Sequence, residues 1–183
     1  MDMQNIENQF TEFKSQLSAL DKKTQDDKLS MVVFSGDLDK ISAAFVIATG
    51  AVAMGMDAVM FFTFWGTPVL RDAKKSVGGK DVFGKMFGAM LPKGLGKVKL
   101  SQMNMGGMGT AMMKHLMKKK NVASLEQFLE MAEELGVRIF VCEMSMDLMG
   151  FKREEMIEYK NLTFCGVAKF LEEAANSKVQ LFI

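Results

Sequence analysis

Two cysteines, Cys142 and Cys165, are the side chains of this sequence best suited to nucleophilic chemistry. Each follows an apolar segment typical of a β-strand, and Cys165 also precedes a segment with helical periodicity. The positive end of a helix favours the thiolate, which is the nucleophilic form, so we expect this benefit most clearly at Cys165. The carboxylates of Glu143 and Asp147 favour the neutral thiol at Cys142. Because free cysteines are often buried and inert, a structural role for both thiols stays open.

Other candidate residues stand at the ends of predicted strands. In parallel α/β sheets, ligands bind in the crevice beyond the carboxyl ends of the strands. Residues that directly follow a strand are therefore candidates for substrate binding. They are Gly36, Asp37, Trp65, Gly66, Met144 and Gly166.

Strand-like and helical segments alternate along most of the chain. Short apolar runs rich in Val, Ile and Phe predict strands at 31–35, 58–64, 137–141, 162–164 and 179–182. Apolar or amphipathic segments predict helices at about 40–54, 124–135 and 167–175. Ser124 and Gln127 form a capping-box pattern at the start of the second of these helices. The alternation predicts an α/β fold of three layers, α/β/α, with a mostly parallel sheet of about five strands.

Residues 1–28 are predicted to precede a single domain at 29–183. Apolar residues at alternating spacings of four and three indicate one face of a helix, and two heptads are too few for a coiled coil. These residues are Ile6, Phe10, Phe13, Leu17 and Leu20. We expect this helix to dock on the domain or on a neighbouring subunit. A charged linker at 21–28 contains no apolar residue before position 29.

A basic insertion at 71–120 interrupts the alternation of strands and helices. It holds twelve basic and two acidic residues, a net charge of +10, whereas the remaining residues carry −9 and the whole chain +1. The near-neutral total disfavours nucleic-acid binding. The insertion itself is expected to attract an anionic donor, an acidic protein or a membrane surface, the last through Phe83 to Leu91 and the lysines beside them.

The insertion also contains eight of the 19 methionines of the chain. Methionine thioethers bind Cu(I), but flexible side chains of this kind favour protein packing or an interface over a metal site. The single histidine, His115, has no readable catalytic partner, so we interpret it as part of a solvated helix face. We predict neither a metal nor a cofactor.

The cysteine content and the N-terminal residues indicate a cytoplasmic protein. Two cysteines without metal-ligand spacing fit a reducing compartment, and the first twenty residues lack the pattern of a signal peptide. The stretch 41–70 carries only Asp57 as a charged residue and has the hydropathy of a membrane candidate. We interpret it instead as a buried helix followed by a buried strand, with a glycine turn at Gly55 between them.

Several segments resemble a family of sulfur-relay proteins. They are Gly136 to Cys142, Phe164 to Leu171, Ser35 to Lys40, Phe61 to Gly66 and Cys142 to Gly150. Together they resemble the DsrE/DsrF/TusD sulfur-relay family, in its longer DsrE-like branch with a Met/Gly-rich insertion. In that family a cysteine directly after the corresponding strand carries a persulfide. The resemblance identifies Cys142 as that cysteine.

The resemblance implies a sulfurtransferase that carries sulfane sulfur. Cys142 would be the acceptor, and Cys165 a second carrier or a resolving thiol. The implied partners are sulfane-sulfur donor and acceptor proteins or small thiols. Exposed apolar residues further favour a homo-oligomer. The alternative is a non-catalytic module that binds a small ligand or assembles into oligomers, with both cysteines structural.

Overall fold

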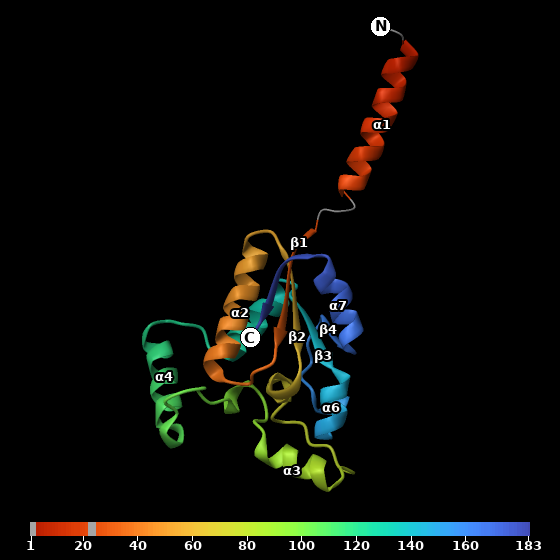
Figure 1. Cartoon of the computed structure of the whole chain (residues 1–183). Helices are drawn as coiled ribbons and strands as arrows, with labels where there is room; N and C mark the ends of the chain where they lie inside the picture. The colour runs from red at the N-terminus through yellow and green to blue at the C-terminus, as the bar shows by residue number, and fades with distance from the viewer. Residues whose placement is uncertain (1–2, 22–24) are drawn as a thin grey trace.

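Five parallel strands form the centre of the computed structural model, which describes residues 3–21 and 25–183 (Figure 1). They run in the order β4-β3-β2-β1-β5, and each neighbouring pair is parallel. Their bounds are Asp26–Val33 for β1, Asp57–Phe62 for β2, Arg138–Cys142 for β3, Leu162–Cys165 for β4 and Ser177–Phe182 for β5. The predicted parallel sheet of five strands is therefore confirmed.

Helices cover both faces of this sheet, as the sequence predicts. Helices α2 (Leu38–Ala53) and α5 (Leu125–Glu134) bury one face, whose core includes Phe45 and Phe62. Helix α7 (Val167–Ala175) covers the other face through Phe170 and Ala174. In Figure 1, α2 and α7 lie on opposite sides of the strands. Buried strands of a parallel sheet read as continuous apolar runs because both of their faces pack against helices.

The carboxyl ends of four strands differ from prediction by one or two residues, whereas β5 ends at Phe182 as predicted. Strand β1 begins at Asp26, so residues 26–28 of the predicted linker belong to the sheet. Strand β1 ends at Val33 and β2 at Phe62, two residues before the predicted ends. Strand β3 instead extends to Cys142 and β4 to Cys165, so each cysteine is the last residue of its strand. Helix α6 (Glu143–Met149) begins immediately after Cys142. The thiols thus belong to the sheet rather than to the loops beyond it.

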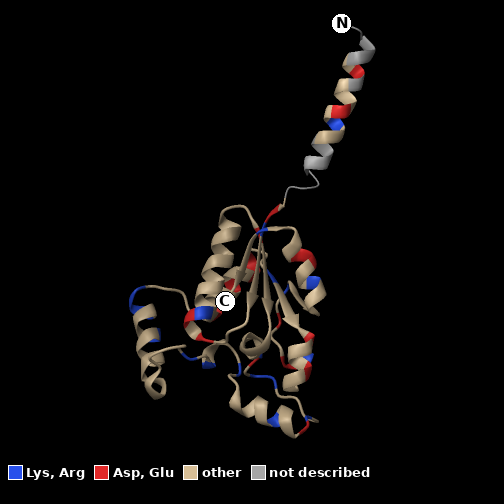
Figure 2. Cartoon of the chain, in the orientation of Figure 1, with Lys and Arg blue, Asp and Glu red and all other residues tan. Residues whose placement is uncertain are grey.

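The basic insertion folds into short helices beyond the carboxyl edge of the sheet. Helix α3 (Val82–Met90) packs on α6, and α4 (Met108–Lys119) stands away from the sheet in Figure 1. Short 3-10 helices also lie in the chain: η1 (Phe64–Leu70), η2 (Leu95–Lys97), η3 (Met105–Gly107) and η4 (Arg153–Glu155). Figure 2 shows Lys and Arg recurring along the segments that join α3 and α4 to the body. As predicted, His115 is exposed on α4.

The predicted N-terminal helix is present as α1 (Met3–Asp21). It projects from the sheet in Figure 1, and Ile6, Phe10 and Phe13 are exposed on it. These three side chains therefore do not dock on the domain of the same chain. The side chains of Leu17 and Leu20, and residues 22–24 of the predicted linker, lie outside the described residues.

The long apolar stretch at 41–70 forms most of α2, all of β2 and the 3-10 helix η1. The predicted buried strand is confirmed, whereas α2 is buried on one face only and exposes Val46 and Ile47. Across residues 3–21 and 25–183, no helix combines the length and the apolar character that crossing a membrane requires.

Candidate functional site

The two cysteines are neighbours on adjacent strands. Cys142 of β3 is in direct register with Cys165 of β4. Adjacent strands lie about 4.8 Å apart, and residues in register on parallel strands point to the same face of the sheet. This Cα separation falls within the range that a disulfide bond accepts, although both cysteines are free thiols in this structure. The pair is therefore close enough for exchange between the two sulfur atoms.

Both thiols are covered by the packing beneath α7. Cys142 is 3% exposed and Cys165 is 8% exposed. They belong to a small apolar cluster on this face, in which the ring of Phe61 stacks on that of Phe170 at 5.0 Å. The other members of the cluster are Val59, Phe140 and Ala174. In this conformation a reagent in solvent reaches neither sulfur atom freely.

Burial also favours the neutral form of the Cys165 thiol. It raises the pKa of the Cys165 thiol, and the nearby Cys142 and Glu143 raise it further, while Lys169 opposes them. Gly166 is the N-cap residue of α7, so Cys165 does lie next to the start of a helix, as expected. The direction of the shift is nevertheless opposite to the one that the helix dipole predicts. Desolvation of the charged form outweighs the dipole because the sulfur is buried.

A partly buried ion-pair network links α7 to the sheet beside the thiols. Arg138 of β3 donates two hydrogen bonds to the Glu173 carboxylate of α7, at 2.6 and 3.0 Å. Lys28 of β1 donates a third at 3.1 Å. The hydrogen bonds from Arg138 lower the pKa of Glu173 against the effect of burial, and Lys28 lowers it further. One carboxylate therefore ties α7 to two strands.

A second group of predicted residues lines a separate cavity at the ends of β1 and β2. This cavity of about 540 Å³ is lined by Ser35, Gly36 and Asp37 after β1 and by Trp65 after β2. Asp37 is the N-cap residue of α2, but its carboxylate pairs with Lys40 at 3.2 Å instead of capping the helix. We call this space the strand-end cavity.

Two of the predicted binding residues, Gly36 and Gly66, have a steric reason to be glycine. A Cβ at Gly36 would lie 2.3 Å from the carbonyl oxygen of Trp65, and one at Gly66 would lie 2.3 Å from that of Val33. The loops that follow β1 and β2 therefore approach each other as closely as glycine allows. Gly36 lines the cavity, whereas Gly66 does not.

The sequence of this chain matches a known protein family. The profile of the DsrE/DsrF/DrsH-like family matches residues 25–182. These residues include the entire sheet and exclude α1. The chain belongs to the DsrE/DsrF/DrsH-like family.

Relatives of this DsrE/DsrF/DrsH-like chain include two proteins of similar length. The uncharacterized protein YrkE of Bacillus subtilis strain 168 is 43% identical over 159 residues, which cover 87% of this chain and 98% of YrkE. The sulfur carrier protein DsrE2 of Allochromatium vinosum is 35% identical over 160 residues, covering 85% and 98%. The crystal structure of the ychN protein from E. coli covers 85% of this chain and 98% of its own, at 10% identity and a TM-score of 0.48.

Five of the six predicted binding residues of this family member thus lie in two places, and Gly66 lies in neither. Met144, exposed at the start of α6, and Gly166 lie next to the thiols in the chain, whereas Gly36, Asp37 and Trp65 line the strand-end cavity. The sequence analysis did not single out the lysines of that cavity, which are Lys93, Lys97 and Lys99. Lys97 and Lys99 flank the buried Val98, and this alternation is a signal that places both lysines on one side of the chain.

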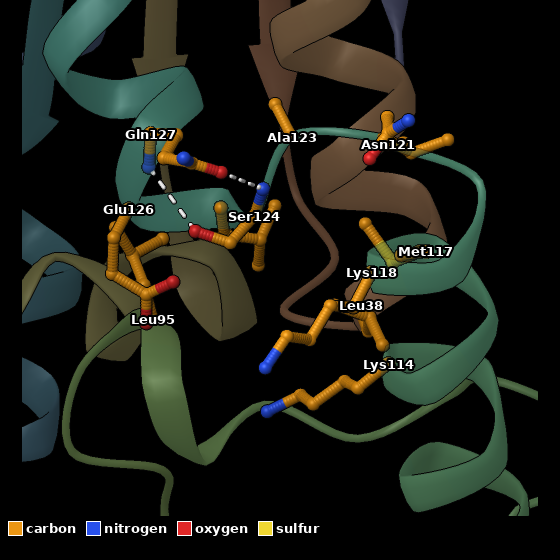
Figure 3. A pocket seen from close by; sticks show the side chains of 12 residues that line it. Leu38, Leu95, Lys114, Met117, Lys118, Asn121, Ala123, Ser124, Glu126 and Gln127 are labelled. Atoms are coloured by element: carbon orange, nitrogen blue, oxygen red, sulfur yellow. Dashed lines mark hydrogen bonds between the residues drawn. The ribbon is translucent and has the colours of Figure 1, made fainter.

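A larger cavity, of about 800 Å³, separates α4 from the body of this DsrE/DsrF/DrsH-like chain (Figure 3). Its walls include Leu38, Leu95 and Leu125 and the side chains of Lys114 and Lys118. Lys114 donates a hydrogen bond to the carbonyl oxygen of Gly96 at 2.9 Å. Figure 3 also shows the capping box at the start of α5, in which Ser124 and Gln127 hydrogen-bond each other's backbone N–H groups. This cavity lies apart from both cysteines.

Proposed function

We propose that this protein carries sulfane sulfur as a persulfide on Cys142, with Cys165 as a second thiol that receives or releases the sulfur. The observation that carries the proposal is the direct register of Cys142 with Cys165, the only two cysteines of the chain. The 35% identical relative named as a sulfur carrier protein supports it. Membership of the DsrE/DsrF/DrsH-like family supports it as well.

The chemistry needs only thiols and a sulfane-sulfur donor. The Cys142 thiolate attacks the outer sulfur of a donor persulfide, R–S–SH, which forms Cys142–S–SH and releases R–S⁻. The Cys165 thiolate then attacks the outer sulfur of this persulfide, which moves the sulfur to Cys165 and restores the Cys142 thiolate. Attack on the inner sulfur instead forms a Cys142–Cys165 disulfide and releases HS⁻. No further oxidant is required in either route.

Because the thiols are buried, this cycle requires the cover over them to open. A donor reaches the Cys142 sulfur only when the cover formed by α7 and the phenylalanine cluster opens. Burial also protects a loaded persulfide from solvent and from unrelated thiols between transfers. We therefore place the control of sulfur transfer in the opening of α7, whose tether is the Glu173 network.

Persulfide mapping by mass spectrometry tests the proposal. The full chain and the Cys142→Ser and Cys165→Ser variants are incubated with a small-molecule persulfide and then digested. We expect one added sulfur atom on Cys142 in the wild type and in Cys165→Ser, and no stable adduct in Cys142→Ser. Equal loading of Cys142→Ser and the wild type would contradict the assignment of Cys142 as the acceptor.

The burial of both thiols favours one alternative, a module that binds a ligand and uses its cysteines only for packing. Alkylation of the native protein separates the two functions. Slow but measurable alkylation of Cys142, which accelerates when α7 is loosened, supports the carrier. Two thiols that react only after global unfolding support the module.

A further inference from the structure

The strand-end cavity has a positively charged wall. Lys93, Lys97 and Lys99 line it, and Asp37 is the only carboxylate among its lining residues. Within residues 3–21 and 25–183, none of the three lysines forms an ion pair, whereas Asp37 is already paired with Lys40. Three ammonium groups without a carboxylate partner around one concave space attract an anion to it. The cavity also lies where parallel α/β sheets bind ligands.

Buried charge behind the wall adds to this positive field. Arg71 donates a hydrogen bond to the carbonyl oxygen of Gly88, which lines the cavity, at 3.3 Å. Arg71 and Lys80 both pair with Glu155, so two buried cations share one carboxylate. The Nε atom of Arg71 is buried and, in the described part of the chain, has no hydrogen-bond partner. A net positive charge therefore lies directly behind the backbone of Gly88.

The remaining wall of the cavity is aromatic and apolar. Trp65 lines it and is 47% exposed, which is unusual for the single tryptophan of a chain. Met90, Leu91 and Pro92 complete this side. Binding sites for small molecules commonly combine an apolar surface with a few charged groups that fix the orientation of the ligand.

We propose that the strand-end cavity binds a small organic oxyanion, with the anionic group held by Lys93, Lys97 and Lys99 and the apolar part packed against Trp65. The volume of about 540 Å³ is in the range of cavities that hold small ligands. This site is separate from the thiol pair and does not depend on the sulfur-carrier function.

Tryptophan fluorescence measures occupancy of the cavity directly, because Trp65 is the only tryptophan. The full chain is titrated at constant ionic strength with phenyl phosphate, benzenesulfonate, inorganic phosphate and phenol, and calorimetry is run in parallel. We expect saturable binding of the two aromatic anions, weaker binding of inorganic phosphate and none of phenol. The two aromatic anions distinguish a phosphate from a sulfonate group. Equal binding of phenol and phenyl phosphate, or no saturable signal by either method, would overturn the proposal.

A pair of matched variants tests the role of the lysines. The triple variant Lys93→Ala, Lys97→Ala and Lys99→Ala removes three charges from the cavity. Its control, Lys118→Ala, Lys119→Ala and Lys120→Ala, removes three charges from the same insertion outside the cavity. We expect about tenfold weaker binding of phenyl phosphate in the first and less than a twofold change in the second. An equal loss in both variants would show that binding depends only on the overall positive charge of the insertion, and it would refute the site.

Asp37→Asn gives a test of opposite sign. Its side chain does not cap α2, so the amide is tolerated, and the substitution removes the one negative charge of the cavity. We expect an anion to bind several-fold more tightly to this variant. Weaker binding would contradict an anion site. Cys142→Ser should leave phenyl phosphate binding unchanged, so failure of the carrier function and failure of this site are distinguishable.

Discussion

Cys165 shows at the scale of one residue how burial changes the chemistry of a strand-end thiol. Its position before α7 offers the N-terminal end of a helix, but the sulfur also lies against Cys142 and beneath aromatic rings. Because the charged form loses its hydration there, the pKa of the thiol rises. A neutral thiol is a poor nucleophile, which fits the proposed role of Cys165 as the second thiol rather than the acceptor.

The raised pKa of Cys165 makes the stability of the protein depend on pH. The folded state holds the thiol proton more tightly than the unfolded state, so this stabilisation is complete below the ordinary thiol value of 9.0. It is lost as pH rises above that value and through the raised pKa. We expect the free energy of unfolding of the wild type to fall more steeply above pH 9 than that of Cys165→Ala. Urea denaturation at several pH values measures both slopes, and parallel slopes would contradict the expectation.

Gly66 offers a second prediction at the residue scale. A Cβ at this position collides with the carbonyl oxygen of Val33, so Gly66→Ala should cost about 1–3 kcal/mol in the free energy of unfolding. The control is Gly50→Ala, inside α2 with no atom near the added methyl group. It should stabilise the protein by about 0.5–1 kcal/mol. Urea denaturation compares the two variants, and a neutral Gly66→Ala would contradict the steric requirement for glycine at this position.

Helix α7 determines, at the scale of elements, whether the thiols are accessible. It is only nine residues long, and it is attached to the sheet by the ion pairs of Glu173 and by a hydrogen bond from Gln180 to the carbonyl oxygen of Ala174. Helix α6 begins directly after Cys142. Helix α3 packs on α6, with a close contact between Gly84 and Gly150. The basic insertion therefore reaches the element that directly follows Cys142.

Loosening α7 should expose the thiols. Glu173→Gln weakens the charged hydrogen bonds from Arg138 and Lys28, so the helix opens more often. We expect native-state alkylation of Cys142 and Cys165 to accelerate about tenfold, the factor that ~1.4 kcal/mol of lost local stability gives. Glu172→Gln is the control, because its carboxylate pairs with the exposed Lys169 of the same helix. Equal rates in the two variants would show that the network does not hold the cover closed.

The whole molecule separates its charges and exposes much apolar surface. The insertion carries +10 and the remaining chain −9, so a second copy of the chain offers a complementary surface. Exposed methionines on and before α4 extend this apolar surface, and they include Met105, Met108 and Met112. The homo-oligomer expected from the sequence stays a prediction.

Self-association is measured by light scattering coupled to size-exclusion chromatography. We expect the wild type to have a mass above that of one chain, and Met108→Glu with Met112→Glu to shift it toward the monomer, because buried carboxylates are costly at an interface. Met54→Glu is the control, since it places the same charge on the exposed methionine at the C-cap of α2. A wild type that is monomeric at micromolar concentration would refute the expectation.

Much of the fold was predictable because its signals are local. Strands β2 and β3 are nearly continuous apolar runs, the capping box marks the start of α5, and α7 has the predicted bounds of 167–175. The site was less predictable. Both cysteines were proposed as site residues, but five of the six proposed binding residues divide between the thiols and the strand-end cavity, and Gly66 lines neither. The sequence indicated the three lysines of the cavity only as part of the basic insertion.

The sequence by itself determined the α/β class, the helices and strands, the family and the strand-end position of both cysteines, because each depends on periodicity or on motifs of a few residues. Only the tertiary structure decided that β3 and β4 are neighbours, which brings Cys142 into register with Cys165. It also decided that α7 buries both thiols and that three lysines from the insertion meet Trp65 across one cavity. These relations join residues far apart in the chain, and strand order and packing, which no local pattern encodes, bring them together.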